Sequence, residues 1–430
     1  MNNDEMQVLG KRREINKREF VTIVLVSLLV LAALVWCGMM LHQHYGTEEL
    51  KERKPIGSTI VPELQQTVDS ILTAEMEMIY AEQGQVIVME VQTGKILAMV
   101  GKERRFDGRY TSCENFAYQQ EPGATMMAAA LLALLETGEV ELTDVVEGED
   151  GIWNADGYDM KDHNWRRGGY GKMTLERALE VSSNIGISKM IRKVFRGKEL
   201  RYFELLDKMS FGRPYAIEGI TGLSPMVSCS PKDSTWASYQ LLWNSIGYER
   251  KMAPIQMLTF YNAIANNGCM VKPTLRDEEK TMVINQQIAS KKSIMDLQIA
   301  LEHVVSQGLG RKAGTPILRV AGKTGTAQAT SRYEDEDITE YHVSFCGYFP
   351  ADAPKYSIIV SMNKLGLPAS GGGMAGHVFH DIVEWMLCHD MPTILVYDEE
   401  TGDTLKLKET DSDGTLTSFK ASEQPKDADV

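Results

Sequence analysis

The sequence predicts an α+β fold in which an antiparallel β-sheet is flanked by helices, carries an all-helical subdomain and follows one N-terminal transmembrane helix. Residues 85–101 contain two β-rich runs joined by Thr93-Gly94, which is a hairpin signal. Few helical segments separate the strand candidates in βαβ fashion, so an antiparallel sheet is favoured over a parallel one. Residues 20–41 form an uncharged apolar run of 22 residues, and about 20 such residues cross a bilayer core of about 30 Å.

The apolar run at residues 20–41 indicates a single-pass membrane anchor. It is longer than the usual signal-peptide core of about 7–15 residues, and no small-x-small cleavage site follows it. By the positive-inside rule, residues 1–19 should be cytoplasmic and the chain after residue 42 extracytoplasmic. Residues 42–64, with glycine and proline among charges, should form a stalk. The cations that precede the run are Lys11, Arg12, Arg13, Lys17 and Arg18.

Composition and charge exclude several classes of protein. With 43% apolar and 24% charged residues, the 430-residue chain is ordinary for a folded protein and unlike a disordered one. A net charge of −14 gives no electrostatic footprint for nucleic acid. No phosphate-binding GxxxxGK[ST] loop is present, and nothing in the sequence implies a cofactor. Six cysteines are too few for a disulfide scaffold, and five of them follow the anchor, so at least one is free or pairs with another chain.

The remaining elements can be placed in order along residues 65–389. Apolar residues at helical spacing predict a helix from Thr67 to Ala81. Pro122 begins a helix that is apolar nearly all round and ends at Gly138, as expected of a helix at the centre of a large domain. Residues 174–210 are helix-rich, and residues 247–273 combine a helix with a glycine stop.

Towards the C-terminus, the pattern predicts three further strands and a final helix at about 374–389. Residues 390–408 could add a hairpin, and the acidic, polar tail 409–430 is expected to be disordered. The three strand candidates are 317–326, 343–349 and 356–362.

Three short motifs occur in a fixed order. Glu121 opens the sequence EPGATMM, Ser182-Ser183-Asn184 lies 58 residues after Ala124, and Lys323-Thr324-Gly325-Thr326 begins 141 residues after Ser182. Each motif is weak alone, because chance supplies such tripeptides often.

Together the motifs resemble those of the penicillin-binding transpeptidases, in particular the class B proteins of division and elongation. That family carries SxxK at a helix start, SxN in a helical subdomain and KTG on an edge strand. The stretches AGKTGTAQ, SFCGYFPADAPKYS and GYERKMAPIQMLTFYNAIANNG are also similar to family sequences, so the resemblance covers about residues 65–389. It implies a penicillin-binding transpeptidase or serine β-lactamase-like fold. It also implies a bacterial plasma-membrane protein whose partners are peptidoglycan stem peptide or proteins of wall synthesis and division.

The chain departs from the family at the two positions that perform the chemistry. The nucleophilic serine is Ala124 here, and the lysine that takes its proton is Met127. Loss of a serine nucleophile costs on the order of 10⁶ in rate. The sequence therefore predicts a dead acyl-transfer site, a pseudoenzyme. A vestigial cleft would keep the family's substrate-binding residues, which are Ser182, Asn184, Lys323, Thr324, Gly325 and Thr326.

Other interpretations stay open at this point. The protein could be an active D,D-transpeptidase or carboxypeptidase that acylates an unrecognised residue such as Thr125. It could instead be a purely structural envelope protein with a collapsed cleft. On its own, Ser182-Ser183-Asn184 could be a helix cap, and Lys323 could be a solvated or paired cation at a strand end.

Two further groups of residues are weaker candidates. A histidine-rich face of the last helix does not have HExxH spacing, so we expect packing or surface roles for it rather than a metal site. It comprises His377, His380, Glu384 and, beyond them, His389. A polar-aromatic loop could bind glycan or peptide, or could simply pack; its residues are Trp153, Tyr158, His163, Asn164 and Trp165.

Overall fold

A six-stranded antiparallel sheet forms the centre of the protein. The computed structural model describes residues 57–329, 339–389, 395–397, 404–410 and 416–420. The strand order is β12-β13-β14-β1-β2-β3, and every neighbouring pair is antiparallel, as predicted. The strands are β1 (Ala81–Glu90), β2 (Ile96–Arg104), β3 (Tyr110–Ser112), β12 (Ala321–Ala329), β13 (Glu340–Phe349) and β14 (Tyr356–Leu365).

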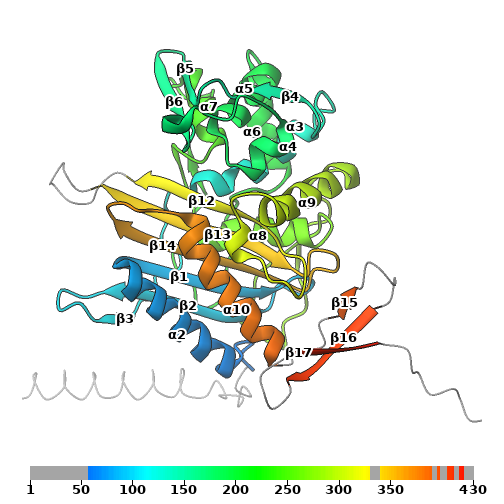
Figure 1. Ribbon diagram of the computed structural model, residues 1–430. Coiled ribbons are helices and arrows are strands. Elements are labelled where there is room, and N and C mark those ends of the chain that lie inside the picture. Colours follow the sequence, from blue (N-terminus) through cyan, green and yellow to red (C-terminus); the bar gives the residue numbers. More distant parts are fainter. Residues whose placement is uncertain (1–56, 330–338, 390–394, 398–403, 411–415, 421–430) are drawn as a thin grey trace, which may run out of the picture. The chain divides into compact units, whose positions relative to one another are not determined.

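The two faces of the sheet belong to two separate hydrophobic cores. Val86 and Val88 of β1 pack into one core with helices α2 (Pro62–Ile79) and α10 (Gly376–Cys388). Ile87 and Met89, whose side chains point to the opposite face, pack into the other core with α8 (Pro254–Ala265). Figure 1 shows α2 and α10 lying along the same face of the strands. The sheet is therefore covered on both faces, which explains why the central strands β13 and β14 are buried along almost their whole length.

The helical subdomain lies between β3 and β12 in the sequence. It begins with a 3₁₀ turn, η1 (Gly123–Met126), and the wholly buried helix α3 (Met127–Leu135). Helix α9 (Lys291–Ser306), which was not predicted, contacts β12, α3 and α4 (Leu175–Glu180) and so joins this subdomain to the sheet. The other helices are α5 (Asn184–Phe195), α6 (Glu199–Lys208) and α7 (Tyr239–Ser245), with 3₁₀ turns η2 (Trp165–Arg167) and η3 (Arg311–Ala313).

Short two-stranded sheets also form in the part of the chain between β3 and β12. They pair β4 (Val145–Glu147) with β7 (Lys172–Thr174), β5 (Ile152–Ala155) with β6 (Tyr158–Lys161), β8 (Val227–Ser228) with β9 (Arg250–Lys251), and β10 (Met270–Val271) with β11 (Val283–Asn285).

Several predicted boundaries need correction. The first helix begins at Pro62, inside the segment expected to be a stalk, because proline suits the first helical position and Thr59 already donates its hydroxyl to Ile96 O at 2.6 Å. Strand β12 begins at Ala321 rather than residue 317. The helix expected from Pro122 starts as the 3₁₀ turn η1 and becomes α-helical only at Met127.

The C-terminal prediction also changes. Instead of one hairpin followed by a disordered tail, a three-stranded antiparallel sheet forms from β15 (Leu395–Tyr397), β16 (Thr404–Thr410) and β17 (Leu416–Lys420). Strand β17 lies within the stretch 409–430, which was expected to be disordered. Pairing with β16 satisfies the backbone hydrogen-bonding groups of β17, and this favours a strand in spite of the polar composition.

The proposed anchor at residues 20–41 and most of the stalk lie outside the described residues. Among the described helices, none combines the length and the apolar character needed to cross a membrane. The five described cysteines are all free, and they are Cys113, Cys229, Cys269, Cys346 and Cys388.

Candidate functional site

The three sequence motifs converge on one cavity of about 260 Å³. Ala124 reaches it from η1, Ser182 and Asn184 from the turn between α4 and α5, and Thr324 and Thr326 from the edge strand β12. A collapsed cleft is therefore not what the described residues show. The volume is just below the range of about 300–1,000 Å³ that is typical of ligand pockets. The remaining lining residues are His163, Leu309, Ala369, Ser370, Gly371 and Gly372.

The 3₁₀ turn η1 sets the directions of the side chains at its start. A 3₁₀ helix has three residues per turn, so Ala124 and Met127 share one side of it while Thr125 points about 120° away. Met127 is fully buried and does not line the cavity. Thr125 is 2% exposed, and its hydroxyl donates to Pro122 O at 2.8 Å. The residue considered as a substitute nucleophile thus faces away from the cavity.

In the Ser182-Ser183-Asn184 turn, one residue caps a helix and the other two line the cavity. Ser183 is the N-cap of α5: its Oγ accepts from Gly186 N at 2.9 Å and donates to Asp162 Oδ2 at 2.7 Å. Ser182, at φ +50, and Asn184 stay at the cavity wall on either side of it. The helix-cap interpretation therefore holds for Ser183 alone.

Lys323 is fully buried behind the cavity. Its Nζ donates to Ser182 Oγ and, at 3.1 Å, to Thr324 O. Burial lowers the pKa of the Lys323 amine to about 7, because no carboxylate among the described residues pairs with it. The interpretation of Lys323 as a strand-end cation that is solvated or ion-paired is therefore wrong: its side chain is buried and forms no ion pair with any described residue.

Glycines allow the walls to approach closely. A Cβ on Gly325 would collide with Ser344 Oγ and lie 3.1 Å from Pro122 O, so glycine is needed where β12 meets η1. Thr326 Oγ1 accepts a hydrogen bond from Gly371 N at 2.9 Å, which attaches the π-helical turn η4 (Gly371–Ala375) to the strand. Gly371 and Gly372, which precede the predicted last helix, line the cavity, and no sequence motif indicated this position.

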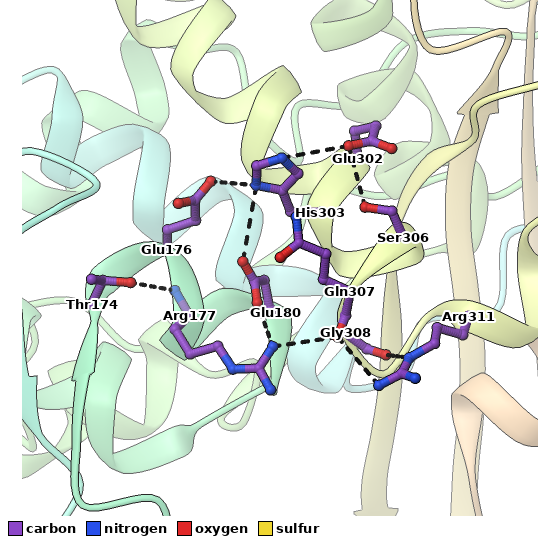
Figure 2. A network of polar contacts seen from close by, with 10 residues as sticks. All are labelled: Thr174, Glu176, Arg177, Glu180, Glu302, His303, Ser306, Gln307, Gly308 and Arg311. Carbon is purple, nitrogen blue, oxygen red and sulfur yellow. Dashed lines mark hydrogen bonds and ion pairs between the residues drawn. The ribbon is translucent and has the colours of Figure 1, made fainter.

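An ionic cluster lies at the junction of α4 and α9 (Figure 2). His303 Nδ1 lies 2.7 Å from Glu176 Oε1 and 4.0 Å from Glu180 Oε1. Glu180 is 5% exposed and also pairs with Arg177 at 2.5 Å. Its backbone carbonyl accepts from the N–H of Leu309 at 3.0 Å, and Leu309 lines the cavity. The cluster therefore adjoins the backbone hydrogen bond that positions Leu309 at the cavity wall.

Replacing His303 by Ala should lower the free energy of unfolding by about 1–2 kcal/mol, because it removes the hydrogen bond to Glu176 and the imidazole that packs beside the buried Glu180. Urea unfolding measures this effect, and amide exchange at Leu309 should become faster. The matched control is Lys292→Ala, which removes an exposed pair with Asp296 on the same helix and should change stability by less than about 0.5 kcal/mol. Equal effects of the two substitutions would contradict a specific role for the cluster.

The histidines of the last helix have separate partners. His377 Nδ1 lies 3.2 Å from Glu75 Oε2, and His380 Nδ1 lies 3.0 Å from Gly314 O. His389 Nδ1 lies 2.9 Å from Trp385 O. The residues of the polar-aromatic loop also lie apart: the Tyr158 ring packs at a tilt against the Tyr239 ring, and of the five loop residues only His163 lines the cavity.

A larger hollow of about 590 Å³ lies at the start of β1 and the end of β2. Its cations are paired, Arg104 with Glu82 at 3.3 Å and Arg105 with Glu103 at 3.2 Å. None of the three motifs reaches it. The smaller cavity is therefore the candidate site.

Comparisons with known proteins agree with this geometry. Stage V sporulation protein D of Bacillus subtilis is 28% identical over 345 residues, which cover 74% of this chain and 51% of the relative. Peptidoglycan D,D-transpeptidase FtsI of Escherichia coli is 25% identical over 71% of this chain and 51% of its own length. The chain thus spans about half the length of these curated relatives.

The fold is shared as well. The TP domain of penicillin-binding protein 3 from Burkholderia pseudomallei aligns with a TM-score of 0.64 and 25% identity, over 77% of this chain and 95% of that domain. The family model described as the penicillin binding protein transpeptidase domain matches residues 84–384, which contain all three motifs. The chain therefore belongs to the penicillin-binding protein transpeptidase family.

Proposed function

We propose that this protein is a membrane-anchored pseudoenzyme of peptidoglycan synthesis or cell division. It acts by binding, with the cavity as its recognition site for a wall peptide or for a protein partner of the wall-synthesis machinery. The observation that supports this is the composition of the cavity wall. The polar groups of Ser182, Asn184 and Thr326 remain in place, while Ala124 contributes only a methyl group.

At the start of η1 the described residues offer no replacement for the lost nucleophile and base. Position 124 has no hydroxyl, and position 127 carries a buried thioether with no basic nitrogen. Thr125, the nearest hydroxyl in sequence, is turned into the protein. The recognition groups, in contrast, are held by strand β12 and by the capped start of α5. Binding without covalent turnover is the function that this arrangement supports best.

Residues 20–41 supply the anchor in this proposal, so that the transpeptidase-like domain lies outside the cytoplasm. Peptidoglycan stem peptide is the proposed ligand class, in keeping with relatives whose names include a peptidoglycan D,D-transpeptidase. No metal or cofactor takes part in the proposed recognition.

Intact mass spectrometry after incubation with a penicillin tests the proposal directly. The full chain in detergent should keep its unmodified mass, while an active penicillin-binding protein treated in parallel gains one drug per chain. The unmodified protein should then recover wall-synthesis proteins or wall peptides from the cell envelope. A stoichiometric adduct would instead support an active transpeptidase or carboxypeptidase, and peptide mapping would identify its nucleophile.

A further inference from the structure

Three exposed cations occupy one loop beside the cavity. Lys161 ends β6, and Arg166 and Arg167 lie in the adjoining turn η2. None of the three forms an ion pair with another described residue, although the chain as a whole carries a net charge of −14. We call these three residues the cationic shelf.

The neighbouring cations behave differently. Lys189 is paired with Glu149, and Arg192 lies 2.7 Å from Asp156. Both of these cations also lie over the ring of Trp153, at 5.3 and 5.5 Å. These neighbouring cations therefore have acidic partners, whereas the shelf cations have none among the described residues.

Two members of the shelf contact an aromatic ring of the same loop. Lys161 Nζ lies 4.8 Å and the Arg166 guanidinium 5.0 Å from the centre of the Trp165 ring. The buried Asp162 accepts hydrogen bonds from Ser183 Oγ and, at 3.1 Å, from Ile185 N. The loop is therefore attached at Asp162 to the turn that presents Ser182 and Asn184.

The shelf continues the cavity. Asn184 lines the cavity and its Nδ2 donates to Lys161 O at 2.9 Å, while His163 lines the cavity from within the shelf loop. Burial lowers the pKa of His163, and Arg167 and then Lys323 lower it further. The charge of Arg167 therefore acts on His163 at the cavity wall.

We propose that the cationic shelf binds a carboxylate of the peptide whose end occupies the cavity. This inference rests on the proposed function and specifies its ligand as an acidic peptide. A cavity of about 260 Å³ accommodates only one end of a peptide. The residues that follow this end and leave past His163 and Asn184 meet Lys161, Arg166 and Arg167. An acidic side chain there gains cationic partners that the protein itself leaves unpaired.

Binding of two synthetic peptides to the full chain tests the proposal. The peptides are acetyl-Ala-Glu-Ala-D-Ala-D-Ala and the same sequence with Gln in place of Glu, and calorimetry measures both. We expect the Glu peptide to bind roughly tenfold more tightly, as three exposed ion pairs allow. This preference should shrink when the salt concentration is raised from 50 to 300 mM, because screening weakens exposed charge pairs.

Matched variants assign the preference to the shelf. Lys161→Gln with Arg166→Gln and Arg167→Gln should abolish it. Lys208→Gln with Lys280→Gln and Lys291→Gln, which makes the same charge change at exposed sites elsewhere, should keep it. Circular dichroism of both variants checks that they are folded.

The outcomes separate this inference from the proposed function. Equal binding of the two peptides, or a preference that survives in the shelf variant, overturns the shelf and leaves cavity recognition standing. If neither peptide binds, both the peptide ligand and the shelf are overturned. A shelf-dependent preference that is unchanged when L-Ala-L-Ala replaces the terminal D-Ala-D-Ala supports the shelf and overturns recognition of the peptide end in the cavity.

Discussion

Replacing Ala124 by Ser together with Met127 by Lys is expected to let the protein form one covalent penicillin adduct per chain. The two positions share one side of the 3₁₀ turn η1, so the new hydroxyl and amine would adjoin each other. Ser182, Asn184 and Thr326 already line the cavity together with position 124. Because loss of a serine nucleophile costs on the order of 10⁶ in rate, even partial restoration should be obvious by intact mass.

The single variants are the controls for this experiment. Ala124→Ser alone supplies a hydroxyl without a base, and Met127→Lys alone supplies an amine without a nucleophile, so both should label far more slowly than the double variant. Met127 is fully buried, and a lysine there needs hydrogen-bond partners. Circular dichroism and thermal unfolding must therefore show that the double variant is folded. A folded double variant that stays unlabelled would mean that the cleft has lost its catalytic geometry.

The sequence predicted the core of the fold because its signals are local. The Thr93-Gly94 turn joins β1 to β2, where Gly94 takes φ +76, and the apolar run after Pro122 is buried as α3. The same turn also packs against the backbone of Lys272, which no local pattern could indicate. Helix α9 was missed, although Ser290 caps it and its buried side chains recur at helical spacing.

The sequence motifs predicted part of the cavity wall, but not the residues that complete it. Of the six predicted cleft residues, four line the cavity: Ser182, Asn184, Thr324 and Thr326. The other two, Lys323 and Gly325, do not line it. The sequence could not show that Leu309 and Gly371 complete its wall, because these residues are brought there by hydrogen bonds to Glu180 and Thr326. It also could not show that Lys323 is buried, since a lysine on an edge strand is ordinarily solvated.

Lys323→Met is expected to reveal a buried amine through the pH dependence of stability. In the folded protein the pKa of Lys323 is about 7, whereas an unfolded lysine titrates near 10.4. Between these values the unfolded chain binds a proton that the folded chain does not, so the stability of the parent rises with pH. The rise amounts to about 1.4 kcal/mol per pH unit at most. The variant has no such group, so the parent should gain about 2–3 kcal/mol relative to it between pH 7 and 9.

Urea unfolding of parent and variant at pH 7, 8 and 9 measures the difference, in which the titrations common to both proteins cancel. Lys280→Met, at an exposed site, should show no such trend. A constant difference between parent and Lys323→Met would mean that the amine stays charged in the folded protein. Ser182 would then face a fixed positive charge, and the cavity would favour an anionic group rather than a neutral one. A rising difference would identify a neutral amine at pH 8, able to accept a hydrogen bond as well as to donate one to Ser182.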